Sequence, residues 1–385
     1  MCISCCAERM EDAKPSSTFA RRSVLAGIGG LAAAYGLSAC TSSAPRPQTH
    51  ATGTTSVAVS PPPTSKLGIV LLGTQAGPPI MADRTGISTA LVVDGATYVI
   101  DCGRASATQY RRSGLEFGSL KTIFITHLHA DHVADYYNFF MLGGGTDPHL
   151  TDGVSGQIPV YGPGPAGGLP PAFGGAAVPT AEPANPTPGL ADLTRKCNEA
   201  FAYSNNVFMR DTGTQDTSAV AVVHEIALPN IGASYTNTAP RMSPFPVMAD
   251  DHVRVTATLV PHGPVFPSFA FRFDTEHGSV TFSGDTTMSD NLIELAHGSD
   301  VLVHESINTQ GSHLPAAAQS HMLQSHTEVQ QVGTVAARAD VPKLVLSHIS
   351  DFGPSLDPAQ WAEWAKQDYS GDVIVGSDLQ AITVR

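Results

Sequence analysis

Apolar and β-branched runs alternate with stretches of helical spacing along most of the chain beyond residue 66. The runs are short and end at glycine or aspartate, which is typical of strands closed by turns. The alternation alone predicts an α/β or α+β fold. The predicted strands cover residues 67–73, 88–93, 97–103, 122–126, 253–260, 268–273, 279–285, 300–306, 343–348, 372–376 and 380–384, and the predicted helices cover residues 106–113, 133–142, 191–210, 288–297 and 325–339.

The segment from about residue 143 to 250 has a different pattern. Glycine and proline dominate residues 143–190, broken only by a strand-like run at 158–161, and the helix predicted at 191–210 follows. Such composition predicts a loop insertion in place of buried elements. An insertion close to a site often shapes a substrate pocket, but a passive insertion is an equally good interpretation.

The chain before residue 67 carries no core pattern. Arg21 and Arg22 precede an apolar run at 24–37, which is too short to span a membrane and has the length of a signal-peptide core. The arginine pair resembles a twin-arginine export signal. The following LSAC resembles a lipobox, which makes Cys40 the predicted lipidation site, and a buried N-terminal helix is disfavoured by the glycines of the run. Residues 41–66 are rich in serine, threonine and proline and predict a disordered tether.

Net charge limits the expected partners of the remaining chain, and its length limits the expected number of domains. The net charge is −13, and no run of lysine or arginine follows the predicted signal, so nucleic acid is not an expected partner. Residues 67–385 are numerous enough for one large domain with a sizeable core. Cys102 ends a predicted strand and is expected to be a small buried residue rather than half of a disulfide.

Histidine and aspartate cluster directly after the strand predicted at 122–126, within the sequence TIFITHLHADH. The cluster therefore falls at the C-terminal end of a strand, where α/β sheets hold their chemistry. Imidazole with carboxylate, without thiolate, favours zinc or a similar first-row ion. The spacing lets His127 and His129 bind one ion while Asp131 and His132 face a second.

The sequence HLHADH resembles the metal-binding signature of the metallo-β-lactamase-fold hydrolases. Further ligands of such proteins follow later strands, and His262, Asp285 and His348 occupy such places here, so the resemblance covers about residues 67–385. It implies a four-layer αββα sandwich that binds two Zn²⁺ ions, with Mn²⁺ or Fe²⁺ as alternatives. The implied ligands are His127, His129 and His262 for the first ion, Asp131, His132 and His348 for the second, and Asp285 as a bridge.

The residue at the bridge separates branches of this superfamily. A cysteine is common there in the β-lactamases proper, so Asp285 resembles the phosphodiesterase, arylsulfatase, lactonase and glyoxalase branches and disfavours antibiotic hydrolysis. His326, in the predicted capping box SHTE, resembles a histidine of ribonuclease Z and its exported arylsulfatase-like relatives that is placed beside the leaving group. Asp131 and His326 are therefore the predicted catalytic residues.

These observations lead to a functional expectation. We expect an exported, lipid-anchored dinuclear zinc hydrolase that acts on small sulfate or phosphate esters, arylsulfatase-like or phosphodiesterase-like, with a metal-bridging hydroxide as nucleophile. A ribonuclease Z-like endoribonuclease is an alternative that the export signal and the acidic balance oppose. A lactone or carboxylic ester hydrolase and a non-enzymatic lipoprotein are further alternatives. The sequence does not determine the oligomeric state.

Overall fold

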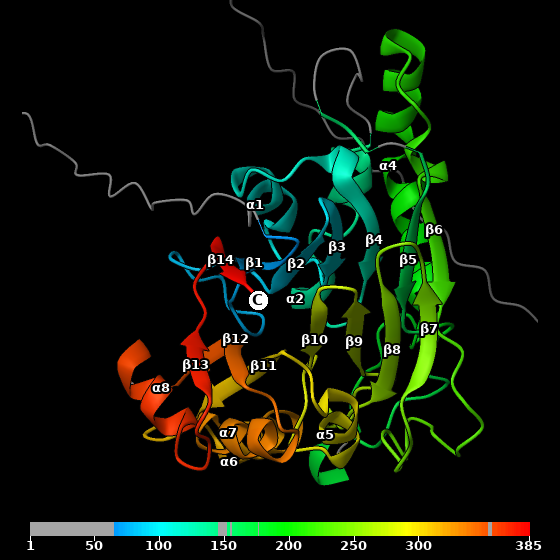
Figure 1. Ribbon diagram of the computed structural model, residues 1–385. Helices are drawn as coiled ribbons and strands as arrows, with labels where there is room; N and C mark the ends of the chain where they lie inside the picture. The colour runs from blue at the N-terminus through cyan, green and yellow to red at the C-terminus, as the bar shows by residue number, and fades with distance from the viewer. Residues whose placement is uncertain (1–64, 145–151, 155, 176, 353–355) are drawn as a thin grey trace, which may run out of the picture. The chain divides into compact units, whose positions relative to one another are not determined.

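The computed structural model describes residues 65–144, 152–154, 156–175, 177–352 and 356–385. The predicted signal peptide, Cys40 and nearly all of the predicted tether lie outside these residues. The described chain forms two seven-stranded sheets with helices on their outer faces (Figure 1). No helix within the described ranges is long and apolar enough to cross a membrane.

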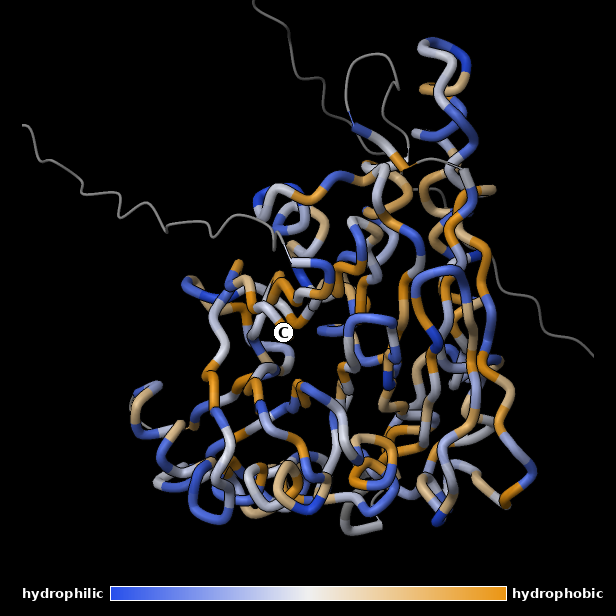
Figure 2. The backbone as a smooth tube through the Cα atoms, in the orientation of Figure 1, coloured by the Kyte–Doolittle hydropathy of each residue, from blue (hydrophilic) through white to orange (hydrophobic). Residues whose placement is uncertain are grey.

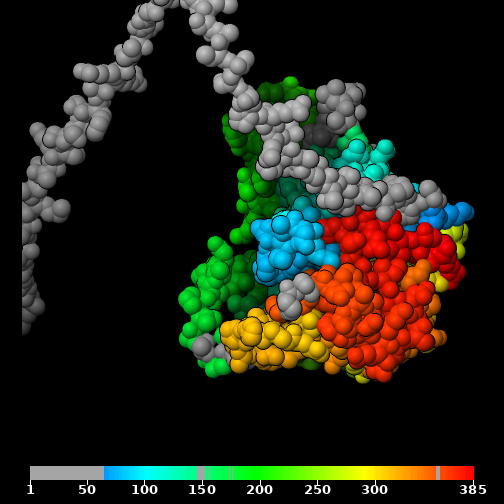
Figure 3. All heavy atoms as spheres, turned by 90° about the vertical axis from the view of Figure 1, so that its left-hand side faces the viewer, coloured from blue at the N-terminus to red at the C-terminus, as the bar shows by residue number. Residues whose placement is uncertain are grey.

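The first sheet has the strand order β14-β1-β2-β3-β4-β5-β6. Strands β14, β1, β2 and β3 are antiparallel neighbours, whereas β3 to β6 are parallel. The strands are β1 (Leu67–Gly73), β2 (Ser88–Val93), β3 (Ala96–Ile100), β4 (Leu120–Phe124), β5 (Ile158–Gly162), β6 (Ala221–Glu225) and β14 (Gln380–Thr383). The last strand of the chain thus pairs with the first, and Figure 3 shows the blue and red ends of the described chain side by side.

The second sheet has the order β13-β12-β11-β10-β9-β8-β7. Its half from β7 to β10 is antiparallel and its half from β10 to β13 is parallel. The strands are β7 (Phe245–Ala249), β8 (Arg254–Leu259), β9 (Phe269–Thr275), β10 (Gly278–Phe282), β11 (Val301–Asn308), β12 (Lys343–Asp351) and β13 (Asp372–Val375).

Alternating side chains along the strands build three apolar layers. In β1, Leu67, Ile69 and Leu71 face the second sheet, whereas Val70 and Leu72 face the outer helices. Because successive strand residues point to opposite faces, one continuous apolar run serves both layers. The first sheet is covered by α1 (Ser106–Arg112) and α3 (Asn138–Met141), and the second by α5 (Asp290–Ala296), α7 (Val329–Arg338) and α8 (Pro358–Ala365). The predicted αββα order is confirmed, and apolar colour follows the strands in Figure 2.

The insertion at 143–250 contributes more to the sheets than its composition predicts. It supplies β5 and the edge strand β6 to the first sheet, and the edge strand β7 to the second. Strands β6 and β7 are half-buried strands at the edges of their sheets, and β7 contains Pro246, a residue that disfavours the prediction of a strand. The predicted helix at 191–210 is present as α4 (Leu190–Thr212), which lies beside β6 (Figure 1).

Two predicted helices differ from the structure. The helix expected at 133–142 is divided into α2 (Ala130–Val133) and α3. Asp135 lies between them, where its backbone N–H donates to the Cys102 carbonyl and its carboxylate accepts the Ala107 backbone N–H. The helix expected at 325–339 begins at Val329, after a separate helix α6 (Ala316–Ser325). Its capping box does not form, because the Glu328 carboxylate accepts the Thr309 backbone N–H at 3.1 Å instead. His326 therefore lies between two helices in extended backbone.

Candidate metal centre

The seven ligands implied by the sequence come together at one edge of the two sheets. His127, His129, Asp131 and His132 follow β4, His262 follows β8, Asp285 follows β10, and His348 lies in β12. The donor atoms of His127, His129 and His262 lie within 4.8 Å of one another, as do those of Asp131, His132 and His348. The two predicted ligand groups are therefore both present in the geometry.

Asp285 lies between the two groups. Its Oδ2 is 3.1 Å from His348 Nε2 and 3.3 Å from His132 Nε2 on one side. On the other side it is 3.7 Å from His262 Nε2 and 3.8 Å from His127 Nε2. A carboxylate that faces ring nitrogens of both groups has the position of a bridging ligand.

The local backbone explains how His348 enters the cluster. In the pairing of β11 with β12, Glu305 faces Ser347 and Ser306 faces Ile349, so His348 is an extra residue in its strand. Its φ of 44° is in the left-handed region, which non-glycine residues rarely occupy. Such a bulge redirects one side chain, and here it turns the imidazole toward Asp131 and Asp285.

Hydrogen bonds behind the cluster set which nitrogen faces inward. The Asp101 carboxylate lies 2.8 Å from His132 Nδ1, and the Ser325 carbonyl lies 2.7 Å from His262 Nδ1. Both oxygens only accept, so each Nδ1 donates and each Nε2 is left for a ligand. Sequence analysis missed Asp101, although its place at the end of β3 beside the metal loop is the signal that could have indicated it.

Several buried atoms of the cluster lack a partner within the protein. Among the described residues, these include His127 Nε2, His132 Nε2 and Asp285 Oδ1. Buried polar atoms are rarely left unpaired, and these three converge where a cation would be bound. Five imidazoles and two carboxylates, without thiolate, also match zinc or a related first-row ion. The residues present therefore fit a bound metal ion.

The protonation states are consistent with a cation at the centre. Burial lowers the pKa of His127 and of His129, and lowers that of His262 to about 3, so all three present neutral imidazole. Burial also opposes charge on His132, but the carboxylates of Asp285, Asp101 and Asp131 raise its pKa well above the ordinary value. The same carboxylates that would face a cation therefore favour a proton on His132.

The predicted catalytic histidine lies at the border of this cluster. His326 Nδ1 is 3.2 Å from Glu305 Oε1 and 3.9 Å from Asp285 Oδ2. Burial works against its charge, but Glu305 and Asp285 raise the pKa of His326 to about 9. Glu305 Oε1 also accepts the backbone N–H groups of Thr286 and Thr327, which hold the carboxylate in place. The geometry thus places His326, paired with Glu305, beside the metal ligands.

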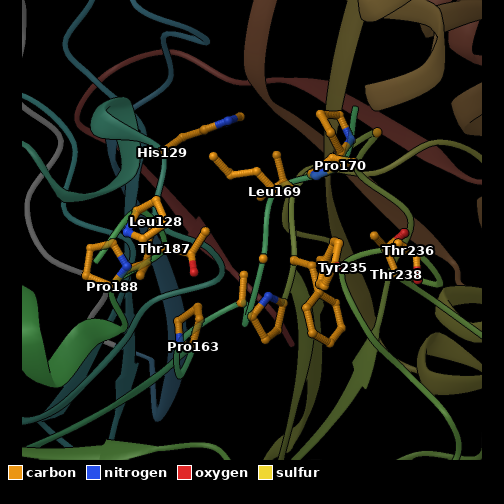
Figure 4. A pocket seen from close by; sticks show the side chains of 18 of the residues that line it. Leu128, His129, Pro163, Leu169, Pro170, Thr187, Pro188, Tyr235, Thr236 and Thr238 are labelled. Carbon is orange, nitrogen blue, oxygen red and sulfur yellow. The ribbon is translucent and has the colours of Figure 1, made fainter. Parts of the chain in front are cut away.

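A cavity of about 1040 Å³ opens beside His129. The insertion supplies most of its lining, from the segments 163–189 and 235–238, and the remainder comes from the β8–β9 loop at 263–267, from α6 and from the metal loop. Figure 4 shows Leu128, Pro163, Thr187 and Pro188 on one side of the cavity and Tyr235, Thr236 and Thr238 on the other. Of the two interpretations of the insertion, pocket formation is the one that this geometry favours.

The architecture is that of the metallo-β-lactamase fold, and the ligand cluster gives it a candidate metal site. The structure resembles the metallo-β-lactamase fold protein YhfI from Bacillus subtilis, with a TM-score of 0.54 and 16% identity over 83% of this chain and 100% of that one. Human tRNase Z, short form, has a TM-score of 0.54 and 22% identity over 83% of this chain and 99% of that one.

Sequence comparison identifies particular relatives. Ribonuclease Z of Mycobacterium bovis (strain BCG / Pasteur 1173P2) is 29% identical over 323 residues, which are 83% of this chain and 98% of the relative. Ribonuclease Z of Mycobacterium tuberculosis (strain ATCC 25177 / H37Ra) is 28% identical over 325 residues, again 83% and 98%. The family model described as Anti-Pycsar protein Apyc1 matches residues 69–139.

Two expectations from the sequence are corrected by these relatives. The arylsulfatase-like assignment is wrong, because the relatives that span nearly their whole length on this chain are ribonucleases Z, which was the stated alternative. The exclusion of nucleic acid as a partner is wrong for the same reason. Net charge failed as a guide because it sums the whole surface and does not report the charge at one site.

Proposed function

We propose that this protein is a ribonuclease Z-like endoribonuclease that hydrolyses phosphodiester bonds of RNA with the help of bound metal. The observation that carries the proposal is the position of Asp285 between two ligand groups, in a chain whose relatives over 98% of their length are ribonucleases Z. Two adjacent cations are well suited to in-line displacement at phosphorus, because the attacking and leaving oxygens can both be stabilised.

The residues that would hold the metals follow from the geometry. His127, His129 and His262 would hold one ion, Asp131, His132 and His348 the other, and Asp285 would contact both. When bound, the ions supply positive charge for the phosphate and polarise the attacking water. The chain itself keeps this arrangement rigid through Asp101, through the Ser325 carbonyl and through the Gly77 N–H, which donates to Asp131 Oδ2 at 2.9 Å.

The remaining chemistry is proton transfer by side chains. As the oxygen of water bonds to phosphorus, its proton passes to a carboxylate, and we assign this role to Asp131 because its side chain is 10% exposed against 2% for Asp285. As the phosphorus–ribose oxygen bond breaks, that oxygen takes a proton from His326. Glu305 orients the His326 ring and stabilises its charge before the transfer.

The test uses purified, zinc-loaded protein and two RNA substrates, a transfer RNA precursor with a 3′ extension and an unstructured RNA of the same length. We expect cleavage of the precursor at a defined position. His348→Ala should abolish cleavage, whereas His313→Ala, which changes an exposed histidine, should retain it. Full metal content without cleavage of either RNA would contradict the proposal.

A further inference from the structure

We propose that the cavity beside His129 binds unstacked nucleobases of the RNA strand next to the scissile phosphate. This inference rests on the proposed ribonuclease function and adds how the substrate is recognised. The cavity touches the metal centre directly, because His129 belongs both to the first ligand group and to the cavity lining. A substrate group that occupies the cavity is therefore adjacent in the strand to the phosphate at the metals.

The chemistry of the lining excludes the charged part of RNA. None of the described residues that line the cavity is aspartate, glutamate, lysine or arginine. A phosphate moved into such surroundings would lose its hydration without gaining a partner. The group that enters is consequently uncharged, and in RNA that group is the base with its ribose.

The lining also matches both the flat apolar face and the polar edge of a base. Proline, leucine and valine side chains and the Tyr235 ring provide flat or apolar contact, and Leu169 and Val178 remain 54% and 63% exposed at this cavity although they are apolar. Thr187, Thr238 and Gln324 provide hydroxyl and amide groups that can meet the polar edge of a base. Proteins that recognise single-stranded RNA place splayed bases against such surfaces.

The position of Tyr235 depends on its packing against Gly168, another residue of the insertion. A Cβ on Gly168 would lie 2.5 Å from the Tyr235 ring, so this glycine is what allows the ring to lie against the backbone there. Figure 4 shows the Tyr235 ring at the cavity. The cavity volume of about 1040 Å³ is slightly above the roughly 300–1,000 Å³ found for ligand pockets, so it accommodates more than one base.

The experiment combines base removal in the substrate with ring removal in the protein. RNA substrates carry a single abasic ribose at one of the positions flanking the cleaved bond, and kcat/KM is measured for wild type, Tyr235→Ala and Tyr203→Ala with the zinc-loaded protein. Tyr203 is the matched control because it is 84% exposed on α4 and does not line the cavity. Thr238→Val, which preserves side-chain shape, serves as a second variant with an intact fold.

We expect an abasic ribose at one or more flanking positions to lower kcat/KM of wild type on the order of tenfold to hundredfold, the range of base stacking on an aromatic ring. Tyr235→Ala should lose a similar factor on intact RNA and little more on the abasic RNA, whereas Tyr203→Ala should behave like wild type. Thr238→Val should change the preference among bases at that position. Equal rates on intact and abasic RNA at every flanking position would overturn the inference while leaving the ribonuclease proposal intact.

Failure of the ribonuclease proposal has a different signature, namely no RNA cleavage by fully metal-loaded wild type. The cavity is then tested by titrating the four uncharged ribonucleosides into the protein and following binding by NMR. Saturable binding that is lost in Tyr235→Ala and kept in Tyr203→Ala supports the cavity assignment. Absence of binding by all four ribonucleosides overturns it.

Discussion

Asp101 lies 2.8 Å from His132 through its Oδ2 and the ring Nδ1, and this contact directs the His132 Nε2 toward the metal centre. The same carboxylate accepts the Thr126 backbone N–H at 2.8 Å, so it connects the end of β3 to the metal loop. Asp101 is held with a φ of 58°, a conformation that aspartate and asparagine tolerate better than most residues. A residue that is not a ligand thus decides the orientation of one.

Replacing this support should weaken metal binding without unfolding the protein. Asp101→Asn removes the charge and introduces amide donors that face the Thr126 donors. We expect roughly a 10- to 100-fold loss of zinc affinity, the usual effect of changing a ligand's outer hydrogen-bond partner, measured by competition with a chelator. Asp94→Asn is the matched control, because Asp94 is an exposed aspartate with a φ of 48°. Unchanged affinity in Asp101→Asn would show that His132 needs no such support.

The bridging position of Asp285 predicts unequal effects of two aspartate substitutions. Asp285→Ala should lower the zinc content of both sites, because its carboxylate faces both ligand groups. Asp131→Ala should lower mainly the second site, since Asp131 faces His132 and His348 only. Zinc per chain by mass spectrometry distinguishes these outcomes, with circular dichroism confirming the fold. Wild-type zinc content in Asp285→Ala would refute the bridge.

The role assigned to His326 predicts a dependence on the leaving group. A proton donor matters for a poor leaving group such as ribose alkoxide and hardly matters for p-nitrophenolate. His326→Ala should keep wild-type zinc content and near-normal turnover of bis(p-nitrophenyl) phosphate, but should lose on the order of 10²- to 10⁴-fold in RNA cleavage. A uniform loss on both substrates, or loss of zinc, would instead indicate a structural or ligand role.

Metal binding should release a proton from His132. Burial opposes its charge, but Asp285, Asp101 and Asp131 raise the pKa of His132 well above the ordinary value, so the metal-free ring is protonated at neutral pH. A cation at Nε2 cannot coexist with the Nε2 proton, so apparent zinc affinity should rise with pH. Zinc titration calorimetry at pH 7 in two buffers of different ionisation enthalpy measures the release. Identical heats in both buffers would exclude it.

Export with lipidation remains a proposal that rests on Arg21, Arg22 and the LSAC sequence. Wild-type protein expressed in a bacterium with a twin-arginine system should be processed and recovered with membranes, and Cys40→Ser should accumulate as unprocessed precursor. Fractionation with detection of a C-terminal tag provides the measurement. A correctly trimmed, soluble product from Cys40→Ser would reject the lipobox.

Much of the candidate site was predictable because four of its candidate ligands lie close together in one short sequence motif. HLHADH places four ligands in six neighbouring positions after a strand, and a buried strand directs them to one edge of the sheet. The later ligands were found only through the family resemblance, because a single histidine or aspartate after a strand carries little information. Asp101 and Gly77 were not predicted, because each is a single residue outside the ligand motif; for Asp101 the one available signal is its position after a strand.

Other expectations failed where a side chain had a stronger partner in space than in sequence. Glu328 has the spacing of a capping box, but Thr309 binds its carboxylate, so helix α7 begins later than predicted. Strands β6 and β7 were missed because they are short edge strands inside the insertion, and Pro246 within β7 disfavours the prediction of a strand. The substrate class was misjudged because overall charge does not describe the surroundings of one site.

By itself, the apolar alternation predicted a mixed α/β or α+β fold and most of its strands and helices, and the histidine and aspartate pattern predicted the chemical type of the metal ligands. The sandwich architecture followed from the family resemblance. Only the tertiary structure decided that Asp101 lies against His132, that Glu305 lies against His326, and that Tyr235 faces a cavity beside His129. The physical reason is the separation along the chain between the residues that interact. Periodicity and ligand type follow from neighbouring residues, whereas these contacts depend on how two sheets and an insertion pack against one another.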